Sequence, residues 1–101
     1  MAATINGKVF QEANVVPLGY QQITDLAAST ALTVPATASI ALIQAEAGDA
    51  RWRDDGVAPT AAVGMLLFDG AELMYNGDLS AVRLIKVTAG TKVNISYWGV
   101  V

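Results

Sequence analysis

The stretch that decides the fold runs from Ala38 to Val63 and reads ASIALIQAEAGDARWRDDGVAPTAAV. Residues 40–47 are apolar on both faces of an extended chain, as in a strand buried between two layers. Gly48 and Asp49 then supply the sharp turn of a hairpin. Residues 50–54 read as the returning strand, with Trp52 pointing to the face opposite its arginine neighbours. This stretch predicts an antiparallel pair of strands.

The same pattern continues on both sides of this hairpin. Short apolar or alternating runs of a few residues are separated by Gly, Pro, Asn and Asp, at spacings typical of all-β domains. Val93, Ile95 and Tyr97 alternate with polar residues and are expected to face the core. No amphipathic helix is apparent. We therefore expect an all-β fold, an antiparallel β-sandwich or jelly roll, with further strands at residues 23–26, 31–34, 63–68, 72–75, 79–88 and 92–98.

The first 20 residues have no clean hydrophobic period, and Pro17 favours extended geometry in its own neighbourhood. We expect residues 1–20 to form an extended N-terminal arm that docks on a neighbouring subunit, and residues 21–101 to form a single β-sandwich domain. The alternative is that this segment lies back on its own sheet as an edge strand. The apolar residues expected to bind a partner through the arm are Ile5, Val9, Phe10, Val15, Val16, Leu18 and Tyr20.

Composition points to an assembly component. The 101 residues suffice for one domain, and 53% are hydrophobic while only 15% are charged, below the value of about 25% that is usual for soluble proteins. Neighbouring subunits would cover part of such a surface; the alternative is a tightly packed monomer. The six basic residues are scattered and the net charge is −3, which argues against nucleic-acid binding. No apolar run is long enough for a membrane helix, and no signal peptide is recognised.

The sequence contains neither His nor Cys. This removes the usual general base, the activated nucleophile and the ligands of zinc, so we expect no enzyme, no cofactor and no small-molecule substrate. Asp54 and Asp55, with Glu72, are the remaining candidates for a carboxylate pair acting on a sugar. However, Asp-Asp-Gly directly after a strand is ordinary turn composition. The other turn aspartates do not have the spacing of a calcium-binding EF-hand loop, and we expect no metal site.

Two further groups of side chains have alternative readings. The aromatic residues Trp52, Tyr75, Tyr97 and Trp98 could form a platform for stacking sugars, but we expect core or interface positions for them. The arginines are expected to pair with aspartates such as Asp78 on neighbouring strands, and between subunits such pairs would select the partner. The residues expected to make these inter-subunit polar contacts are Arg51, Arg53, Asp54, Asp55 and Arg83.

Several segments, in this order, resemble small structural proteins encoded by tailed phages and prophages. The resemblance covers roughly residues 25 to 99 and does not include the first 20. It is an association of short segments that is more specific together than any one alone. These segments are Ile40–Glu46, Ala50–Gly56, Pro59–Ala61, Val63–Met65, Gly77–Arg83 and Val93–Tyr97.

The resemblance implies a virion component and leaves its position in the virion open. A short, β-rich, charge-poor chain without catalytic groups favours a head decoration or cement protein that stabilises the capsid by bridging its subunits. Its partners would be the major capsid protein and copies of itself, as a dimer or trimer. The chain would be made in the host cytoplasm and located on the capsid surface. The alternative is a tail or fibre component that binds a host-surface glycan.

Overall fold

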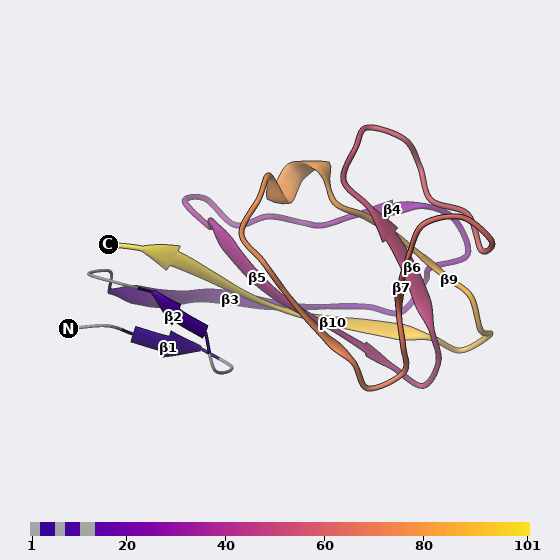
Figure 1. Cartoon of the computed structure of the whole chain (residues 1–101), viewed down its shortest axis with the longest axis horizontal. Coiled ribbons are helices and arrows are strands. Elements are labelled where there is room, and N and C mark those ends of the chain that lie inside the picture. The colour runs from indigo at the N-terminus through magenta and orange to yellow at the C-terminus, as the bar shows by residue number, and fades with distance from the viewer. Residues whose placement is uncertain (1–2, 6–7, 11–13) are drawn as a thin grey trace.

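The computed structural model describes residues 3–5, 8–10 and 14–101, with side chains from residue 14 onward. Within these residues the chain is all-β, with antiparallel strands and one short 3-10 turn, as the sequence predicts (Figure 1). No helix in this part of the chain is long and apolar enough to cross a membrane. The strands are β1 Ala3–Ile5, β2 Lys8–Phe10, β3 Val15–Ile23, β4 Thr30–Ala31, β5 Ile40–Glu46, β6 Ala50–Arg53, β7 Met65–Leu67, β8 Glu72–Tyr75, β9 Arg83–Lys86 and β10 Lys92–Val100, and the 3-10 turn η1 is Leu79–Ala81.

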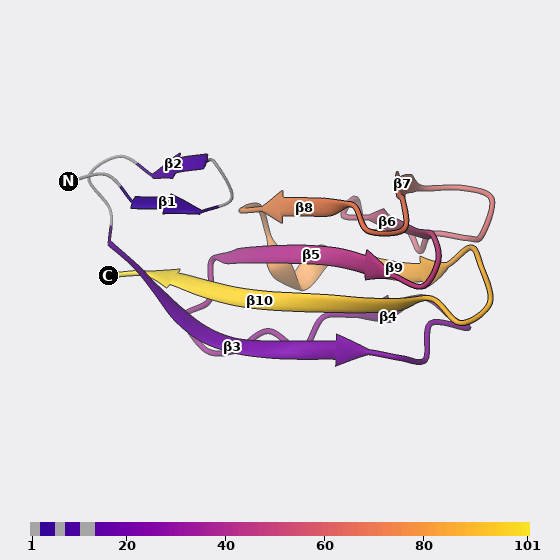
Figure 2. The ribbon, with the colours of Figure 1, turned by 90° about the horizontal axis from the view of Figure 1, so that it is seen from below.

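The strands from β3 onward form two four-stranded antiparallel sheets (Figures 1 and 2). The first sheet has the order β3-β10-β5-β8 and the second has the order β4-β9-β6-β7. Counted inward from both ends, β3 pairs with β10, β4 with β9, β5 with β8 and β6 with β7. The strands are therefore paired as in one long antiparallel hairpin that has been divided between two sheets. β1 and β2 pair only with each other within the described residues.

The core takes side chains from both sheets, and it follows the period of two that the sequence shows. On β10, Val93, Ile95 and Tyr97 are buried and alternate with partly exposed residues, which confirms the predicted inward face. Ile95 pairs with Ile43 of β5 in the register between these strands. From the second sheet, Leu84 of β9 joins the same cluster. Complete burial of each such aliphatic side chain stabilises the fold by about 1.5–3 kcal/mol.

The turn between β5 and β6 is tied to the turn between β9 and β10. Ala47 has a φ of 65° and Gly48 a φ of 154°, so the chain reverses through backbone that favours glycine. The hydroxyl of Thr91, which is 1% exposed, lies 3.0 Å from the carbonyl oxygen of Asp49 and 2.8 Å from that of Thr88. A turn is thus present at Gly48, and a buried threonine fixes its position. The hairpin predicted across it is wrong, because the chain crosses here from one sheet to the other: β5 pairs with β10 and β8, and β6 pairs with β9 and β7.

The N-terminal segment differs from the expected arm. Residues 15–20 belong to β3, the edge strand of the first sheet, which pairs with β10 along its whole length. A β-bulge near Leu18 and Gly19 accommodates Pro17 in this strand. The alternative reading, an edge strand on the chain's own sheet, therefore describes residues 15–20. Docking of a more N-terminal arm stays a prediction, because the side chains of Ile5, Val9 and Phe10 lie outside the described residues.

Further strand predictions are corrected. The strand expected over residues 23–26 is absent beyond Ile23, where β3 ends, and the strand expected over residues 63–68 is confined to Met65–Leu67. The strand expected over residues 79–88 begins only at Arg83, because Asp78 caps the 3-10 turn η1 by accepting the Ser80 N–H at 3.0 Å. The local capping bond offers the backbone an alternative to the sheet ladder. The strand expected over residues 31–34 is reduced to Thr30–Ala31. In contrast, β5, β6 and β8 lie where the sequence places them, within one residue.

Candidate protein interaction surface

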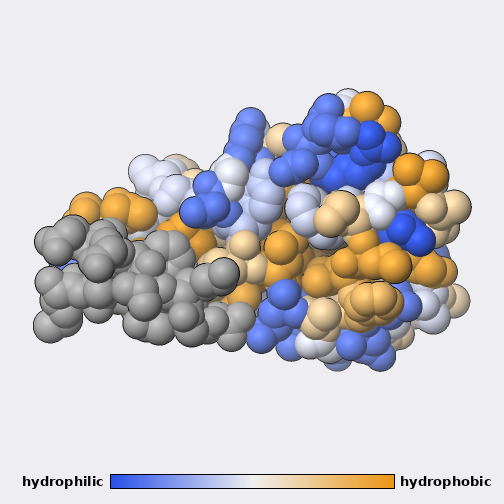
Figure 3. All heavy atoms as spheres, in the orientation of Figure 1, coloured by the Kyte–Doolittle hydropathy of each residue, from blue (hydrophilic) through white to orange (hydrophobic). Residues whose placement is uncertain are grey.

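An apolar surface surrounds β7, the last strand of the second sheet. Leu67 turns into the core, but five apolar side chains on β7 and in the segments before and after it in the chain are between 42% and 60% exposed. In Figure 3 hydrophobic atoms gather over the part of the molecule where β6 and β7 lie in Figure 1. Large apolar side chains that are exposed together mark a site of interaction more often than single ones do. We call this the β7 surface, and its members are Val57, Val63, Met65, Leu66 and Phe68.

The loop that supplies Val57 and Val63 is held by Arg51 of β6. Its Nε donates a hydrogen bond to the carbonyl oxygen of Ala61 at 3.1 Å, and its Nη1 donates to that of Gly64 at 2.7 Å. Hydrogen bonds from a charged donor are about twice as strong as neutral ones. Arg51 therefore acts on the backbone of its own chain and makes no ion pair among the described side chains.

The loop is also ordered by its own residues. The backbones of Thr60 and Val63 exchange two hydrogen bonds, and the Thr60 hydroxyl accepts the N–H groups of Ala62 and Val63. Gly64 has a φ of 144°, and a Cβ there would lie 3.1 Å from the Cβ of Arg51 and 3.2 Å from Pro59. The β7 surface is thus presented by a preformed loop, which lowers the entropy lost when a partner binds.

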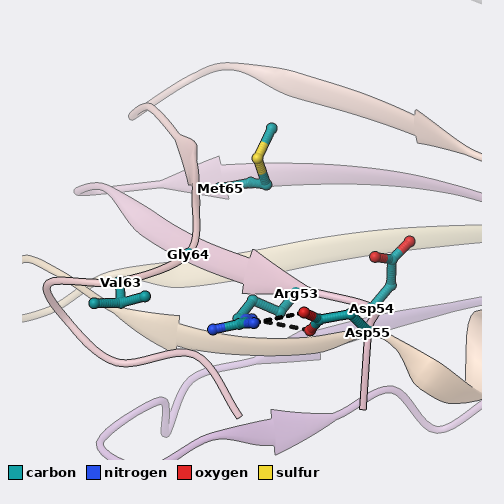
Figure 4. A pocket seen from close by; sticks show the side chains of 6 residues that line it. All are labelled: Arg53, Asp54, Asp55, Val63, Gly64 and Met65. Atoms are coloured by element: carbon teal, nitrogen blue, oxygen red, sulfur yellow. Dashed lines mark hydrogen bonds and ion pairs between the residues drawn. The ribbon is translucent and has the colours of Figure 1, made fainter. Parts of the chain in front are cut away.

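A shallow hollow of about 430 Å³ lies at the rim of the β7 surface. It is lined by Arg53, Asp54 and Asp55 on one side and by Val63, Gly64 and Met65 on the other (Figure 4). Arg53 and Asp55 form a two-pronged ion pair, with nitrogen–oxygen distances of 2.9 and 2.5 Å. The hydrogen bond from Arg53 lowers the pKa of the Asp55 carboxyl, and the same bond raises the pKa of Arg53. The pair is exposed, so it adds little to stability and instead fixes the charge at the rim.

Two aromatic residues next to the hollow, Trp52 and Tyr75, support its rim. The rings of Trp52 and Tyr75 meet edge to face, with centroids 5.9 Å apart and planes at 75°. The Tyr75 hydroxyl donates to Asp54 Oδ2 at 2.8 Å. Desolvation, with the Asp54 carboxylate as a second cause, raises the pKa of Tyr75 to about 12. Both rings pack against the core from a half-buried position, which fits the expectation that they are structural.

From the sequence, Arg51, Arg53, Asp54 and Asp55 are assigned to polar contacts between subunits, and that assignment stays a prediction. The structure places these four residues on β6 and directly after it, beside the hollow. The expected cross-strand ion pairs are absent among the described side chains: the Arg53–Asp55 pair is local, and Asp78 caps η1. Arg83 is exposed on β9 and lies opposite Arg53 in the strand register.

The apolar members of the β7 surface were missed. The sequence predicts an ordinary strand over residues 63–68, and the lack of charge in this run is the available signal. The side chains of this run are exposed because β7 is the last strand of its sheet. The order of strands in a sheet depends on the topology of the whole chain, so a local pattern does not predict it. Among the arm residues that the structure describes, Val16 and Tyr20 are exposed, whereas Leu18 packs against the core.

The four aromatic residues considered for a sugar platform are not arranged as one. Tyr97 is buried, and its hydroxyl donates to Gln21 Oε1 at 2.7 Å. Trp98, the next residue on β10, points to the opposite face of the sheet and is half-buried. Trp52 and Tyr75 contact each other at the β6–β8 side. Desolvation raises the pKa of Tyr97 to about 12.

The turn aspartates satisfy backbone groups. Asp49 Oδ1 accepts the N–H of Asp69 at 2.8 Å, and Asp78 Oδ1 accepts that of Ser80. Among the residues that the structure describes, no group of three or more His, Cys, Asp or Glu side chains is placed to hold a metal ion.

Fold and surface together define an all-β protein with two four-stranded antiparallel sheets and an exposed apolar sheet edge. Comparison of the chain with protein-family models, with curated proteins and with solved structures finds no match.

Replacing Arg51 with alanine is expected to loosen the loop over residues 57–64. Two charge-assisted hydrogen bonds to its backbone are lost, and the free energy of unfolding should fall by about 1–3 kcal/mol. Thermolysin should then cleave within this loop faster than in the wild type. Arg83→Ala is the control, because it removes the same charge from an exposed position without a hydrogen bond to the loop. Equal cleavage of the two variants would contradict the role given to Arg51.

Stability is expected to fall at high pH because of Tyr75 and Tyr97. Their pKa values are raised to about 12 in the folded protein, against an ordinary value of 10.0. The unfolded chain therefore loses these protons first, so the stabilisation is complete below pH 10 and disappears as the pH rises towards 12. Chemical denaturation at pH 8, 10 and 11 should show the loss, and Tyr75→Phe should reduce it. The same dependence in Tyr75→Phe would contradict the contribution of Tyr75.

Proposed function

We propose that this chain is a structural protein of a tailed phage, a head decoration or cement protein that stabilises the capsid by bridging its subunits. The observation that carries the proposal is the β7 surface, a preformed and uncharged patch on a chain with few charged residues. Specific protein contacts bury about 1,600 Å² in total, and repetition over a lattice strengthens each contact. The partners are the major capsid protein and further copies of the chain.

The topology supports this proposal. The pairs β3–β10, β4–β9, β5–β8 and β6–β7, divided between two sheets that enclose one core, fit a β-sandwich with the strand order of a jelly roll. Eight-stranded jelly rolls are common in viral capsid proteins and also in lectins. The fold is therefore compatible with a shell protein, although a fold by itself does not assign a function.

The chemistry of the chain supports a role in binding. The sequence has no His and no Cys, and the acidic residues near the hollow are engaged in an ion pair and in a hydrogen bond to Tyr75. The segments that resemble phage structural proteins include Ala50–Gly56 and Val63–Met65, which border the β7 surface. Two of the six resembling segments thus lie at or beside the β7 surface.

The glycan-binding alternative receives less support. A sugar platform needs aromatic faces open to solvent. Trp52 is covered in part by Tyr75, and Trp98 is half-buried. Tyr20 is exposed, but its hydroxyl is engaged by Asn94 Oδ1 at 2.6 Å.

Counting the copies of this chain per particle tests the proposal. Particles made by the phage or prophage that encodes the chain would be purified and analysed by quantitative mass spectrometry. A shell protein should be present in hundreds of copies, because it follows the capsid lattice. A tail or fibre protein would be present in at most about a dozen, because it follows the symmetry of the tail. Absence from the particle would overturn the proposal altogether.

A further inference from the structure

We propose that Asn76 is a site of spontaneous deamidation, where the folded chain slowly converts asparagine into aspartate and isoaspartate and thereby weakens the corner between β8 and η1. The inference goes beyond the proposed function and does not depend on it. Three observations carry it: the exposure of Asn76 and Gly77, the absence of hydrogen bonds that would hold their reacting groups, and the packing that keeps glycine at residue 77.

The reacting groups are exposed and unrestrained. Asn76 and Gly77 follow directly after β8, precede η1 and are both exposed. In this corner the Tyr75 hydroxyl donates to Asp54, and Asp78 accepts the N–H of Ser80. In the part of the chain that the structure describes, neither the Asn76 side chain nor the N–H of Gly77 takes part in a hydrogen bond. The side-chain amide and the next main-chain nitrogen can therefore approach each other.

The ring of Tyr75 explains why glycine occupies position 77. The φ of Gly77 lies outside the left-handed region, so its backbone conformation does not require glycine. A Cβ at this position would, however, lie 2.6 Å from Tyr75 Oη and 2.8 Å from Tyr75 Cζ. The Tyr75 hydroxyl is itself held by Asp54 at 2.8 Å. The packing of Tyr75 thus retains the one residue that has no side chain to shield the nitrogen next to Asn76.

The reaction is an intramolecular substitution followed by hydrolysis. The main-chain nitrogen of Gly77 bonds to Cγ of Asn76, the Cγ–Nδ2 bond breaks, and ammonia leaves with the proton that the Gly77 nitrogen gives up. Water then opens the resulting cyclic imide at one of its two carbonyl carbons. Opening at Cγ gives aspartate. Opening at the main-chain carbonyl gives isoaspartate, in which the main chain runs through Cβ and Cγ. Water is the only co-reactant, and nothing is oxidised or reduced.

Both products disturb the corner between β8 and η1. Either one places a carboxylate at residue 76, directly beside Tyr75 and two residues before Asp78. Desolvation, then the hydrogen bond and charge of Asp54 and the charge of Asp78, raise the pKa of Tyr75 to about 12, so this corner is already acidic. Isoaspartate also lengthens the main chain between Tyr75, which packs against the core, and Asp78, which caps η1. We therefore expect conversion to lower the stability of the fold.

Peptide mapping of the aged wild type tests the site. The folded chain would be kept at mildly alkaline pH, digested and analysed by mass spectrometry against an unaged sample, with isoaspartate separated by chromatography. Asn76 should convert about tenfold faster, or more, than Asn14, which is also exposed but precedes the β-branched Val15. Asn94 should stay unchanged, because three side chains hold its amide by hydrogen bonds. Conversion of Asn76 no faster than that of Asn14 would overturn the inference.

A matched pair of variants tests the effect on stability. The sequence holds a second Asn-Gly pair, Asn6 and Gly7, which lies outside the described residues. Asn76→Gln removes one pair and Asn6→Gln removes the other, because glutamine forms the corresponding imide much more slowly. After ageing, Asn6→Gln should unfold at a lower temperature than before, since Asn76 still converts, whereas Asn76→Gln should keep its Tm. Equal changes in the two variants, or a loss confined to Asn76→Gln, would contradict the weakening of this corner.

Discussion

Replacing Tyr97 with alanine is expected to lower the free energy of unfolding by about 3–5 kcal/mol, the range observed for loss of a large buried aromatic side chain. Tyr97 is 1% exposed and is the largest of the fully buried side chains, in a central strand of the first sheet. Since small domains are stable by only about 5–15 kcal/mol, much of the total would be lost. Urea denaturation followed by circular dichroism would measure it.

Tyr97→Phe is the matched control for this prediction. It keeps the ring and removes only the hydroxyl, which donates to Gln21 Oε1. Gln21 also accepts the N–H of Thr33 through the same oxygen, so it keeps one partner. We expect a loss of about 0.5–1.5 kcal/mol for the phenylalanine variant. Losses of similar size for Tyr97→Ala and Tyr97→Phe would contradict the conclusion that ring packing dominates at this position.

Replacing Gly48 with alanine is expected to have the second largest effect, a loss of about 3 kcal/mol from overpacking and backbone strain together. A Cβ at this position would lie 2.3 Å from Thr91 Oγ1 and 2.8 Å from Thr88 Cβ. The methyl group would therefore displace the hydroxyl that holds the turns after β5 and after β9 together. Thermal unfolding would show the loss as a lower Tm.

Gly70→Ala separates the two causes. Gly70 has a φ of 79°, but no atom lies within 4 Å of a Cβ built there, so alanine adds strain without a clash. We expect a loss of about 1–2 kcal/mol at this position. If both alanine variants lowered the Tm equally, the contact with Thr91 would not be what requires glycine at residue 48.

The local pattern of the sequence was sufficient to predict the position of four strands in the two sheets. β5, β6, β8 and β10 combine alternating or fully apolar runs with strong turn signals, and such runs depend little on the rest of the chain. The predicted start of β9 was wrong, because the capping bond from Asp78 favours a 3-10 turn over residues 79–81 in place of the strand. Residues 15–20 were misjudged for a different reason: the sequence does not show that β10, more than 70 residues away, offers a free edge to them.

The candidate site was predictable in its charges and not in its apolar part. Asp54 and Asp55 follow a strand directly, so their place at a turn near Arg53 could be inferred from spacing. The hydrogen bonds from Arg51 to the carbonyl groups of Ala61 and Gly64 could not be predicted, because they depend on the conformation of the loop. The exposure of Leu66 could not be predicted either, because it depends on the order of the strands in the sheet.

The position of β10 between β3 and β5 has a kinetic consequence. Its two neighbours begin at Val15 and Ile40, so the centre of the first sheet forms only when segments far apart in sequence meet. Closing such long loops costs entropy before the contacts can compensate for it. Proteins dominated by non-local pairing refold over milliseconds to seconds, and we expect this chain to refold at such a slow rate. Until β10 is in place, the apolar faces of β3 and β5 remain open to other chains, so aggregation competes with refolding at high concentration.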